Sequence, residues 1–371
     1  MGQHICHIIN RFSAGGASTV IQNIVNNDPN NRHTICCMEE VIEIDPNNVN
    51  GRLVSFNEKH KFDPIALFHI YKFLKHQNID VLHLHLPYSQ TVGRLAAKFS
   101  GIPHVISTQH NIPQSHHPVT RYLEFLTRRF DDLTVSVSDG VKEANLRSRE
   151  NWLCGDNIKW RTIHNTINVS EFNQHVNEAD PSKIQPISKY DPVLLNVSRY
   201  VKQKSHSDLI SVMNIIIDKY PGAHLYFVGR GPLENQIREE VRQKGLKDHI
   251  TVTGFVTQEE LFRYYSLADL FVLSSIREGF GIVLIEAMAA EIPVVATDIP
   301  GVNEVVEDGV TGKLVDENAP KQLANAVYTI LKEGLGEEYG TNGYCRTIDK
   351  FSIEQSVSEY KALYDEVQSN K

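Results

Sequence analysis

Short apolar runs alternate with amphipathic segments along most of the chain. In the first half the apolar runs have the length of strands, and the segments between them carry helical periodicity. Such alternation is typical of parallel β/α units, in which each strand is followed by a helix that packs on the sheet. One doubly wound α/β unit is therefore predicted here. Its strands are expected at 4–9, 80–85, 104–108, 133–138 and 158–163, and its helices near 17–27, 64–77, 88–100, 118–131 and 139–150.

The second half repeats this pattern after an interruption. Residues 173–192 are polar, contain prolines and show no periodicity, so they are predicted to be a linker. We expect a Rossmann-like domain over 1–180, a second one over 188–352, and a C-terminal helix over 353–371. The strands of the second domain are expected at 193–198, 223–229, 250–254, 269–274, 293–297 and 311–315, and its helices include 204–219, 231–245 and 282–290.

Composition and charge narrow the class of protein. The 371 residues are 41% hydrophobic and 22% charged, typical of a globular protein with room for two domains. A net charge of -8 lacks the basic field of a general nucleic-acid binder, so no nucleic acid is expected as a partner. No apolar run of about 18 residues occurs and MGQHICHIIN lacks the order of a secretory signal, so we expect a cytoplasmic protein. The five cysteines lack metal-site spacing and are expected to be reduced thiols.

Glycines after predicted strands are candidate anion sites. Gly15 and Gly16 in RFSAGGAST (11–19) stand between a strand and a helix, where backbone N–H groups can approach a phosphate. Gly229 and Gly231 in VGRGPLENQI repeat this design. A tight turn explains either pair equally well. The order G-x-G-x-x-G is not completed, which disfavours a nicotinamide dehydrogenase.

Two cations flank the first strand-to-helix turn of the second domain. Arg199 and Lys204 in NVSRYVKQKSHSDLI (196–210) would suit a diphosphate beside a helix N-terminus. Basic residues on exposed loops are as often simply solvated. Both interpretations therefore stay open from local chemistry.

Two glutamates lie on either side of a glycine-containing turn in SIREGFGIVLIEAMA (275–289). Glu278 precedes Gly279 and Gly281, whereas Glu286 falls inside an apolar helix, where a carboxylate is costly unless it has a partner. The glycines permit close backbone approach, and a helix N-terminus offers N–H groups to a phosphate. A sugar diphosphate would use all of these features, with Glu278 on sugar hydroxyls and Glu286 on a ribose diol.

The same motifs occur in the order found in family-4 retaining glycosyltransferases, which the chain resembles over essentially its whole length. The resemblance includes the E-x7-E region at 278–286, PVVATDIPGVNEVVEDGVTGKLV (293–315), VSRYVKQK (197–204), FVGRGPLENQI (227–237) and the glycine loop. It implies the α/β architecture called GT-B, with two Rossmann-like parallel-sheet domains facing across a cleft and a C-terminal helix crossing back to the N-terminal domain. In the family the second domain binds a nucleotide sugar and the first binds the acceptor.

This resemblance assigns roles to particular residues. Arg199 and Lys204 match the pair that holds the donor diphosphate, Glu278 the acid beside the transferred sugar, and Glu286 the acid on the ribose. The implied catalytic residues are Glu278, Arg199, Lys204 and His110, the last in STQHN at the cleft side of the first domain. The implied donor-binding residues are Gly16, Arg199, Lys204, Gly229, Gly231, Phe255, Glu278, Gly279, Phe280, Gly281, Ile282 and Glu286.

A mechanism is implied as well. In the front-face reaction attributed to such enzymes, the departing phosphate oxygen helps to remove the acceptor proton while the sugar passes through an oxocarbenium-like state. Arg199, Lys204 and helix amides would stabilise the leaving group. The chain lacks a D-x-D motif, so no metal and no cofactor are expected. UDP is favoured in the donor and GDP-mannose is possible, and the acceptor is expected to be a glycan, a glycolipid or a lipid-linked oligosaccharide.

Two further features have competing interpretations. Residues 120–130 (TRYLEFLTRRF) are explained most simply by a helix packed on its sheet, the alternative being a basic amphipathic edge at the inner face of a membrane. His83 and His85 fall on one face of a strand. Like His116 and His117, they are expected to line a cleft or a surface rather than to bind a metal.

Other functions are compatible with the same architecture. A sugar-nucleotide epimerase would turn over its substrate without an acceptor, and a sugar phosphorylase of the glycogen type would need pyridoxal phosphate, for which we find no motif. A non-catalytic sugar-nucleotide-binding subunit would bind without turnover.

Overall fold

The chain folds into two compact units. The computed structural model describes residues 2–13, 15–39, 44–57, 64–154, 158–184 and 191–369. Met1–Thr166 and Ile353–Lys371 make up the first unit, and Ile167–Ser352 make up the second. Among the helices of the described residues, none combines the length and apolar character that crossing a membrane requires.

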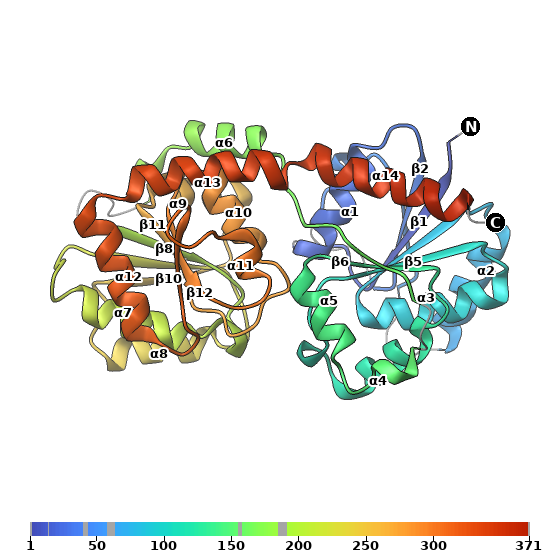
Figure 1. The fold of residues 1–371 in the computed structure, drawn as a ribbon, viewed down its shortest axis with the longest axis horizontal. Helices are drawn as coiled ribbons and strands as arrows, with labels where there is room; N and C mark the ends of the chain where they lie inside the picture. The colour runs from blue at the N-terminus through green and yellow to red at the C-terminus, as the bar shows by residue number, and fades with distance from the viewer. Residues whose placement is uncertain are drawn as a thin grey trace. The chain divides into compact units, whose positions relative to one another are not determined.

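A parallel sheet of seven strands forms the centre of the first unit (Figure 1). Its order is β3-β2-β1-β4-β5-β6-β7, so the direction of strand addition reverses between β1 and β4. The sequence predicts five of these strands but neither β2 nor β3, because β2 begins with three polar residues and β3 has only four residues. The strands are β1 (His4–Ile9), β2 (Arg32–Cys37), β3 (Arg52–Ser55), β4 (Val81–His85), β5 (His104–Gln109), β6 (Leu133–Ser136) and β7 (Trp160–Thr162).

Helices cover both faces of this sheet. Buried residues of α2 and α3 share one core cluster with β1, β2, β4 and β5. Residues of α1 and α14 pack on the other face, and Figure 1 shows these two helices side by side. The C-terminal helix thus belongs to the first unit, as the predicted fold class requires. The helices are α1 (Gly16–Asn26), α2 (Pro64–His76), α3 (Pro87–Ser100), α4 (Pro118–Arg128), α5 (Asp139–Leu146) and α14 (Ile353–Ser369).

The second unit is built on a six-stranded parallel sheet. Its order is β10-β9-β8-β11-β12-β13, with the reversal between β8 and β11. The sequence predicts all six strands, because most of them are apolar runs that the sheet buries on both faces. They are β8 (Val193–Val197), β9 (His224–Val228), β10 (Ile250–Gly254), β11 (Leu270–Leu273), β12 (Val294–Thr297) and β13 (Gly312–Val315).

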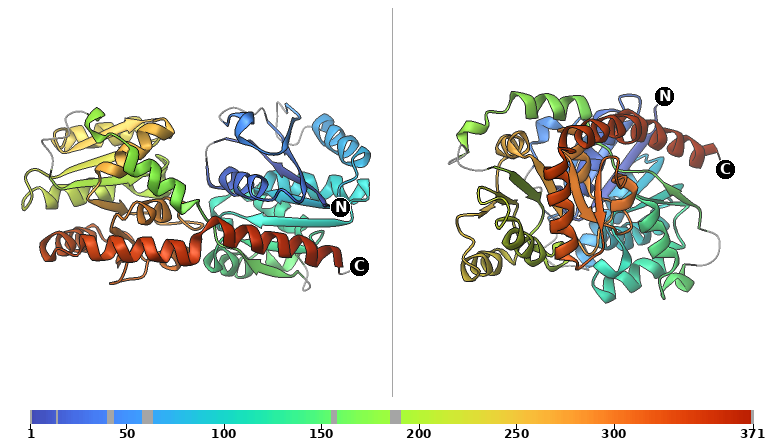
Figure 2. Two further views of the ribbon diagram at one scale, coloured as in Figure 1. Left: turned by 90° about the horizontal axis from the view of Figure 1, so that it is seen from above. Right: turned by 60° about the vertical axis from the view of Figure 1, so that its left-hand side comes forward.

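Two helical layers enclose the second sheet. Helices α7, α8 and α12 share a core cluster with one of its faces, and Figure 2 gives two further views of the layers. The opposite layer contains α9, α10 and α13 (Figure 1). The helices are α6 (Val169–Glu178), α7 (His206–Ile216), α8 (Glu234–Gln243), α9 (Gln258–Leu267), α10 (Ile282–Ala289), α11 (Val302–Val305), α12 (Pro320–Glu333) and α13 (Gly336–Phe351).

Part of the predicted linker is helical, so the linker prediction is wrong for residues 173–178. Asn168 caps the start of α6 by accepting a hydrogen bond from the Glu171 N–H group. Phe172 then packs its ring edge-on against Phe262 at 5.4 Å and Tyr265 at 5.3 Å. These ring contacts, together with the buried Val169 and Val176, hold a helix whose other residues are polar.

The same helix moves the boundary between the units. Because α6 packs within the second unit, the first unit ends at Thr166 instead of residue 180. Residues 185–190 of the predicted linker lie outside the described residues.

Candidate functional site

The candidate site of the second unit lies where its strand order reverses. Ligands of open parallel sheets bind outside the carboxyl ends of the strands at this point. The loops after β8 and β11 meet here, because Ser274 Oγ donates hydrogen bonds to the carbonyl oxygens of Lys204 (3.0 Å) and Ser205 (2.9 Å). The Ile276 N–H group also donates to the Gln203 carbonyl at 2.9 Å. The two loops that carry the predicted charges are therefore joined.

Lys204 and Glu278 form an ion pair across these joined loops. Lys204 Nζ contacts Glu278 Oε1, which also accepts a hydrogen bond from Ser275 Oγ at 2.8 Å. The two side chains are only 13% and 9% exposed. Among the described residues, no protein group donates to Glu278 Oε2. This oxygen can therefore accept a hydrogen bond from a ligand.

Arg199 contrasts with this pair, because its side chain is exposed. Within the described part of the chain its guanidinium makes no hydrogen bond or ion pair, although its backbone carbonyl accepts from the Val201 N–H group. An unpaired cation beside a neutralised pair gives the loop a positive charge that the protein itself does not balance. Such a group can receive an anion.

Gly229 and Gly231 have a structural reason to be glycine. A Cβ atom at Gly229 would lie 2.0 Å from the carbonyl oxygen of Ser198, and one at Gly231 would lie 2.4 Å from that of Tyr200. The Tyr200 N–H group donates to the Arg230 carbonyl at 2.9 Å. These glycines let the loop after β9 pack on the loop that carries Arg199.

Phe255 stands just beyond β10 with its side chain 63% exposed. The Arg230 guanidinium lies 4.9 Å from the centre of its ring, within cation–π range. An aromatic ring held by a cation and open to solvent offers a flat surface on which a planar group can stack.

The turn before α10 brings backbone close to the candidate site. Gly281 has φ 89° and begins the helix without a side-chain cap. Gly279 is buried, and a Cβ atom at Gly301 would come within 2.8 Å of its carbonyl oxygen. The Phe280 ring packs against Phe351 in the core, whereas Ile282 is partly exposed.

Glu286 has the partner that its apolar helix demands. Tyr265 donates its hydroxyl to Glu286 Oε2 at 2.7 Å. Burial raises the pKa of Glu286 above 4.5, and the Tyr265 hydrogen bond partly opposes the shift. One carboxylate oxygen is thus held by the protein.

In the first unit, Gly16 begins α1 at the carboxyl end of β1. Gly15 and Gly16 are both exposed, and Gly15 (φ 154°) precedes the helix without a side-chain cap. Ala14, within the same loop, lies outside the described residues. An uncapped helix start can hold an anion but does not require one.

His110 follows β5 and joins a neighbouring histidine. His110 Nε2 lies 3.1 Å from His85 Nδ1, at hydrogen-bond distance. Its other ring nitrogen, Nδ1, is buried and has no partner among the described residues. Burial lowers the pKa of His110 to about 3, so the ring is neutral near neutral pH.

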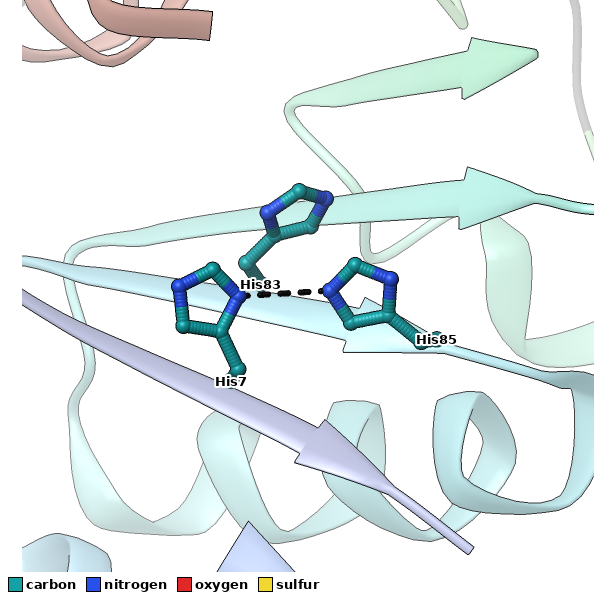
Figure 3. Close-up of side chains that lie close together, drawn as sticks. All are labelled: His7, His83 and His85. Carbon is teal, nitrogen blue, oxygen red and sulfur yellow. Dashed lines mark hydrogen bonds between the residues drawn. The ribbon is translucent and has the colours of Figure 1, made fainter. Parts of the chain in front are cut away.

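His7, His83 and His85 form a buried cluster on the face of the sheet covered by α14. Figure 3 shows the three rings, with His7 Nδ1 and His85 Nε2 3.3 Å apart. His83 and His85 share a strand face as predicted, but the expectation that they line a cleft or surface is wrong, because both are fully buried. Among the described residues this is the one group of histidine, cysteine and acidic side chains spaced as metal ligands, with nitrogens within 4.8 Å of one another.

Helix α4 shows why residues 120–130 contain arginines. Arg128 is buried, pairs with Glu124 and lies 4.2 Å from the centre of the Phe125 ring. Arg121 pairs with Glu150 at 2.7 Å. The simpler interpretation, a helix packed on its sheet, accounts for these contacts, and they give no support to membrane contact through this helix.

Several partners of the site residues are not predicted by the sequence. Ser274, Ser275 and Tyr265 hold the charged groups, and Thr297 Oγ1 donates to the Ser275 carbonyl. For the serines and Thr297 the sequence signal is a small hydroxyl residue at the end of a strand, and such residues are common in turns. Tyr265 lies within α9 and carries no such signal. The predicted residues of the second unit cluster around its strand reversal, whereas Gly16 and His110 belong to the first unit.

Two sequence models of known families match the chain. One, described as glycosyl transferases group 1, matches residues 178–345. The other, described as glycosyltransferase family 4, matches residues 14–171. Together they span nearly the whole chain.

Named relatives and solved structures agree with these matches. The chain is 24% identical over 319 residues to the UDP-Gal:alpha-D-GlcNAc-diphosphoundecaprenol alpha-1,3-galactosyltransferase of Escherichia coli, covering 83% of this chain and 81% of that protein. Over 147 residues, 38% of each protein, it is 35% identical to a GDP-mannose-dependent alpha-(1-6)-phosphatidylinositol monomannoside mannosyltransferase of Mycobacterium tuberculosis. The crystal structure of Anabaena HepE in complex with UDP and glucose has a TM-score of 0.83 at 17% identity, covering 98% of this chain and 100% of that one. The predicted fold class is confirmed.

Proposed function

The chain belongs to the family-4 glycosyltransferases of the GT-B fold, and from this premise we propose which reaction it performs. It moves a hexose from a nucleotide diphosphate sugar to a hydroxyl of a glycan, glycolipid or lipid-linked oligosaccharide, with retention of anomeric configuration. The observation that carries this proposal is the exposed Arg199, without an ion-pair partner among the described residues, beside the Lys204–Glu278 pair at the strand reversal.

The positive charges at the site complement the negative charge that develops on the leaving group during transfer. As the bond to the sugar breaks, negative charge accumulates on the nucleotide diphosphate, and Arg199 and Lys204 stabilise it. Glu278 Oε2 accepts a hydrogen bond from a hydroxyl of the sugar. The uncapped start of α10, at Gly281 and Ile282, offers N–H groups to a phosphate.

The nucleoside meets different residues. Glu286 keeps Oε2 on Tyr265 and uses its other oxygen for the ribose diol. Phe255, flat and exposed, is the surface for the base. Gly229 and Gly231 act by keeping the loop after β9 packed on the Arg199 loop.

The first unit binds the acceptor, with His110 and the loop at Gly16 as its contribution to the reaction. No protein nucleophile is required if the departing phosphate oxygen takes the acceptor proton. Reaction without a metal ion remains a prediction, and loss of activity in excess chelator would contradict it.

UDP is the favoured nucleotide. The E. coli relative is named for UDP-galactose, and HepE was crystallised with UDP and glucose, whereas the mycobacterial relative is named for GDP-mannose. Cytoplasmic location, with peripheral contact at the inner face of a membrane, is likewise a prediction.

The test is a thermal-shift and calorimetric screen of the full chain against UDP, GDP, ADP and their common sugar conjugates, without added metal. Selective stabilisation by one nucleotide is expected, because a ligand that binds only the folded state raises its stability. Arg199→Ala should abolish this shift. The matched control is Lys219→Ala, which removes an exposed cation beyond the other end of α7.

Two outcomes would favour other functions. Turnover of the sugar nucleotide without any acceptor would indicate an epimerase, and tight binding without turnover would indicate a non-catalytic subunit. If no nucleotide binds the wild-type chain, the proposed donor site is wrong.

A further inference from the structure

A chain of polar side chains crosses the middle of the sheet of the first unit, from β2 to the end of β5. It starts at Asp28, which precedes β2, and passes through His33 on β2, His7 on β1 and His85 on β4 to His110 after β5. Successive ring nitrogens or oxygens lie 3.2, 3.2, 3.3 and 3.1 Å apart. We call these five residues the histidine chain.

Burial keeps the four imidazoles neutral. Burial lowers the pKa of His7, His33 and His85, and their histidine neighbours add to the effect at His7 and His85, whereas Asp28 opposes it at His33. His110 is likewise neutral. A neutral imidazole carries one N–H group and one lone pair, so each ring can donate only once.

One end of the histidine chain dictates the direction of every hydrogen bond. Asp28 Oδ2 accepts from Asn31 Nδ2 at 2.8 Å, and Lys361 Nζ lies 3.6 Å from Asp28 Oδ1, so the carboxylate acts as an acceptor. His33 must then donate from Nε2, which leaves its Nδ1 to accept.

The same rule repeats along the chain. His7 donates from Nε2 to His33, His85 donates from Nε2 to His7, and His110 donates from Nε2 to His85. The ring nitrogen left over is His110 Nδ1, the atom that is buried without a partner among the described residues. It carries a lone pair.

We propose that Asp28 sets the tautomer of all four histidines, so that His110 presents the Nδ1 lone pair to a hydroxyl group of a bound ligand. His33, His7 and His85 are positioning residues, because they act only through His110. The fixed tautomer does not rest on the proposed function, but the role of His110 toward a sugar hydroxyl as that ligand group does.

A metal ion would require a different arrangement of protons. To bind one through His7 Nδ1 and His85 Nε2, both atoms must offer lone pairs, whereas the histidine chain places a proton between them. His83 already uses both of its nitrogens, at 2.8 Å from the Tyr364 hydroxyl and 2.7 Å from Thr108 Oγ1. The hydrogen bonds thus account for the whole cluster in Figure 3.

The test is long-range ¹H–¹⁵N NMR of the full chain with ¹⁵N-labelled histidine, at neutral pH and after treatment with chelator. His7, His33, His85 and His110 should each show a protonated Nε2 and a bare Nδ1. A bare Nε2 on any of them, or a mixture of tautomers at His110, would overturn the proposal. Titration with Zn²⁺ should leave these signals unchanged, and stoichiometric Zn²⁺ binding at His7 and His85 would refute it.

Two variants test whether the direction of the hydrogen bonds, and not the packing of the rings alone, sets the tautomer of His110. His33→Phe removes the link to Asp28 while keeping a ring at that position, and His110 should then show both tautomers. Tyr364→Phe is the matched control, because it changes a partner of His83, which lies outside the histidine chain. It should shift the signals of His83 and leave the His110 tautomer unaltered.

Activity gives a second readout once a donor has been identified. His33→Phe should lower kcat/KM about tenfold, the effect of about one misdirected hydrogen bond. Combining His33→Phe with His110→Ala should lower kcat/KM no further than His110→Ala alone, because both substitutions act through His110 Nδ1. Additive losses would contradict the positioning role, whereas failure of the donor screen would leave the NMR result standing.

Discussion

The carboxyl edges of the two sheets share a topology but not a chemistry. In both sheets the strand order reverses between the first and the fourth strand of the unit, which creates the same kind of crevice. In the second unit this edge carries charged groups, namely Arg199, Lys204 and Glu278. In the first unit it carries neutral imidazoles, including His85 and His110.

Burial explains the difference. Arg199 is exposed, and the Lys204–Glu278 pair keeps about a tenth of its surface in water, so ionised groups are tolerated there. His7, His83 and His85 are fully buried, where charge is expensive and a group that can both donate and accept is favoured. The shared strand order therefore determines where a site forms, and the exposure of its side chains determines which chemical groups it can contain.

The largest expected effect is a dependence of stability on pH, caused by the buried neutral histidines. Unfolding exposes them to water, where their pKa values return to about 6.5, while burial holds those of His83 and His110 at about 3. Stability from these groups is complete above pH 6.5 and is lost as the pH falls toward 3. Each of these histidines should add about 1.4 kcal/mol per pH unit to the slope of unfolding free energy against pH. Urea unfolding from pH 7 to pH 4 measures this slope.

An unfolding free energy that rises with pH is the sign expected for the buried histidines of the first unit. A His83→Gln variant should lose about one histidine's share of the slope, whatever its absolute stability. An unfolding free energy that stays flat from pH 7 to pH 5 would mean that the imidazoles are not buried in neutral form.

The second prediction breaks the ion pair of the second unit. Lys204→Met leaves the Glu278 carboxylate largely buried without its cation, which should cost about 3–5 kcal/mol. The thermal midpoint should fall by roughly 10 °C in a calorimetric scan. Lys202→Met, a change at an exposed lysine in the same turn, is the control and should melt with the wild type. Equal melting of both variants would show that the pair contributes little.

Arg199 should behave in the opposite way. Arg199→Ala should lower kcat/KM about 10²–10³-fold, because it removes a group that stabilises the leaving diphosphate. Its thermal midpoint should match that of the wild type, since the side chain is exposed and unpaired among the described residues. Steady-state kinetics with the donor found in the screen, beside a calorimetric scan, measure both. A large loss of stability would place Arg199 in the fold rather than in the reaction.

The smallest expected effect concerns Glu286. Burial raises its pKa above 4.5 in the folded state, so ionisation of this group opposes folding at neutral pH. The free energy of unfolding of Glu286→Gln should therefore exceed that of the wild type by up to about 1 kcal/mol at pH 7. This gain should vanish as the pH falls through 4.5.

Donor affinity gives the second measurement for that variant. Glu286→Gln should weaken nucleotide binding in calorimetry if the carboxylate holds the ribose. Tyr265→Phe removes the hydrogen bond that favours the charged form, so it should raise the Glu286 pKa further. A Glu286→Gln variant that is less stable than the wild type at every pH would contradict the expected sign of the pKa shift.

The sequence predicts the second unit better than the first. Continuous apolar runs such as VLLNV at 193–197 reveal their strands, and Arg199 and Glu278 follow such runs directly. β2 is missed because RHTICC begins with three polar residues, and β3 because RLVS has only four residues, two of them polar. Hydrophobic patterns therefore fail where a strand is rich in polar residues or very short.

Long-range partners could not be predicted at all. Only the H-x-H of His83 and His85 is visible as a motif, whereas His7, His33 and His110 come from distant segments that the strand order brings together. The polar sequence of helix α6 predicts a linker, since the aromatic contacts of Phe172 with α9 do not appear in that sequence.

The position of α14 has a consequence for biosynthesis. The second unit is an uninterrupted segment, Ile167–Ser352, inserted into the first, so α14 is synthesised only after the whole second unit. Tyr360, Leu363 and Tyr364 of that helix belong to a core cluster of the first unit. The N-terminal segment of the first unit therefore leaves the ribosome before the helix that, with α1, completes this face of its sheet, while the second unit, synthesised in between, can finish folding first.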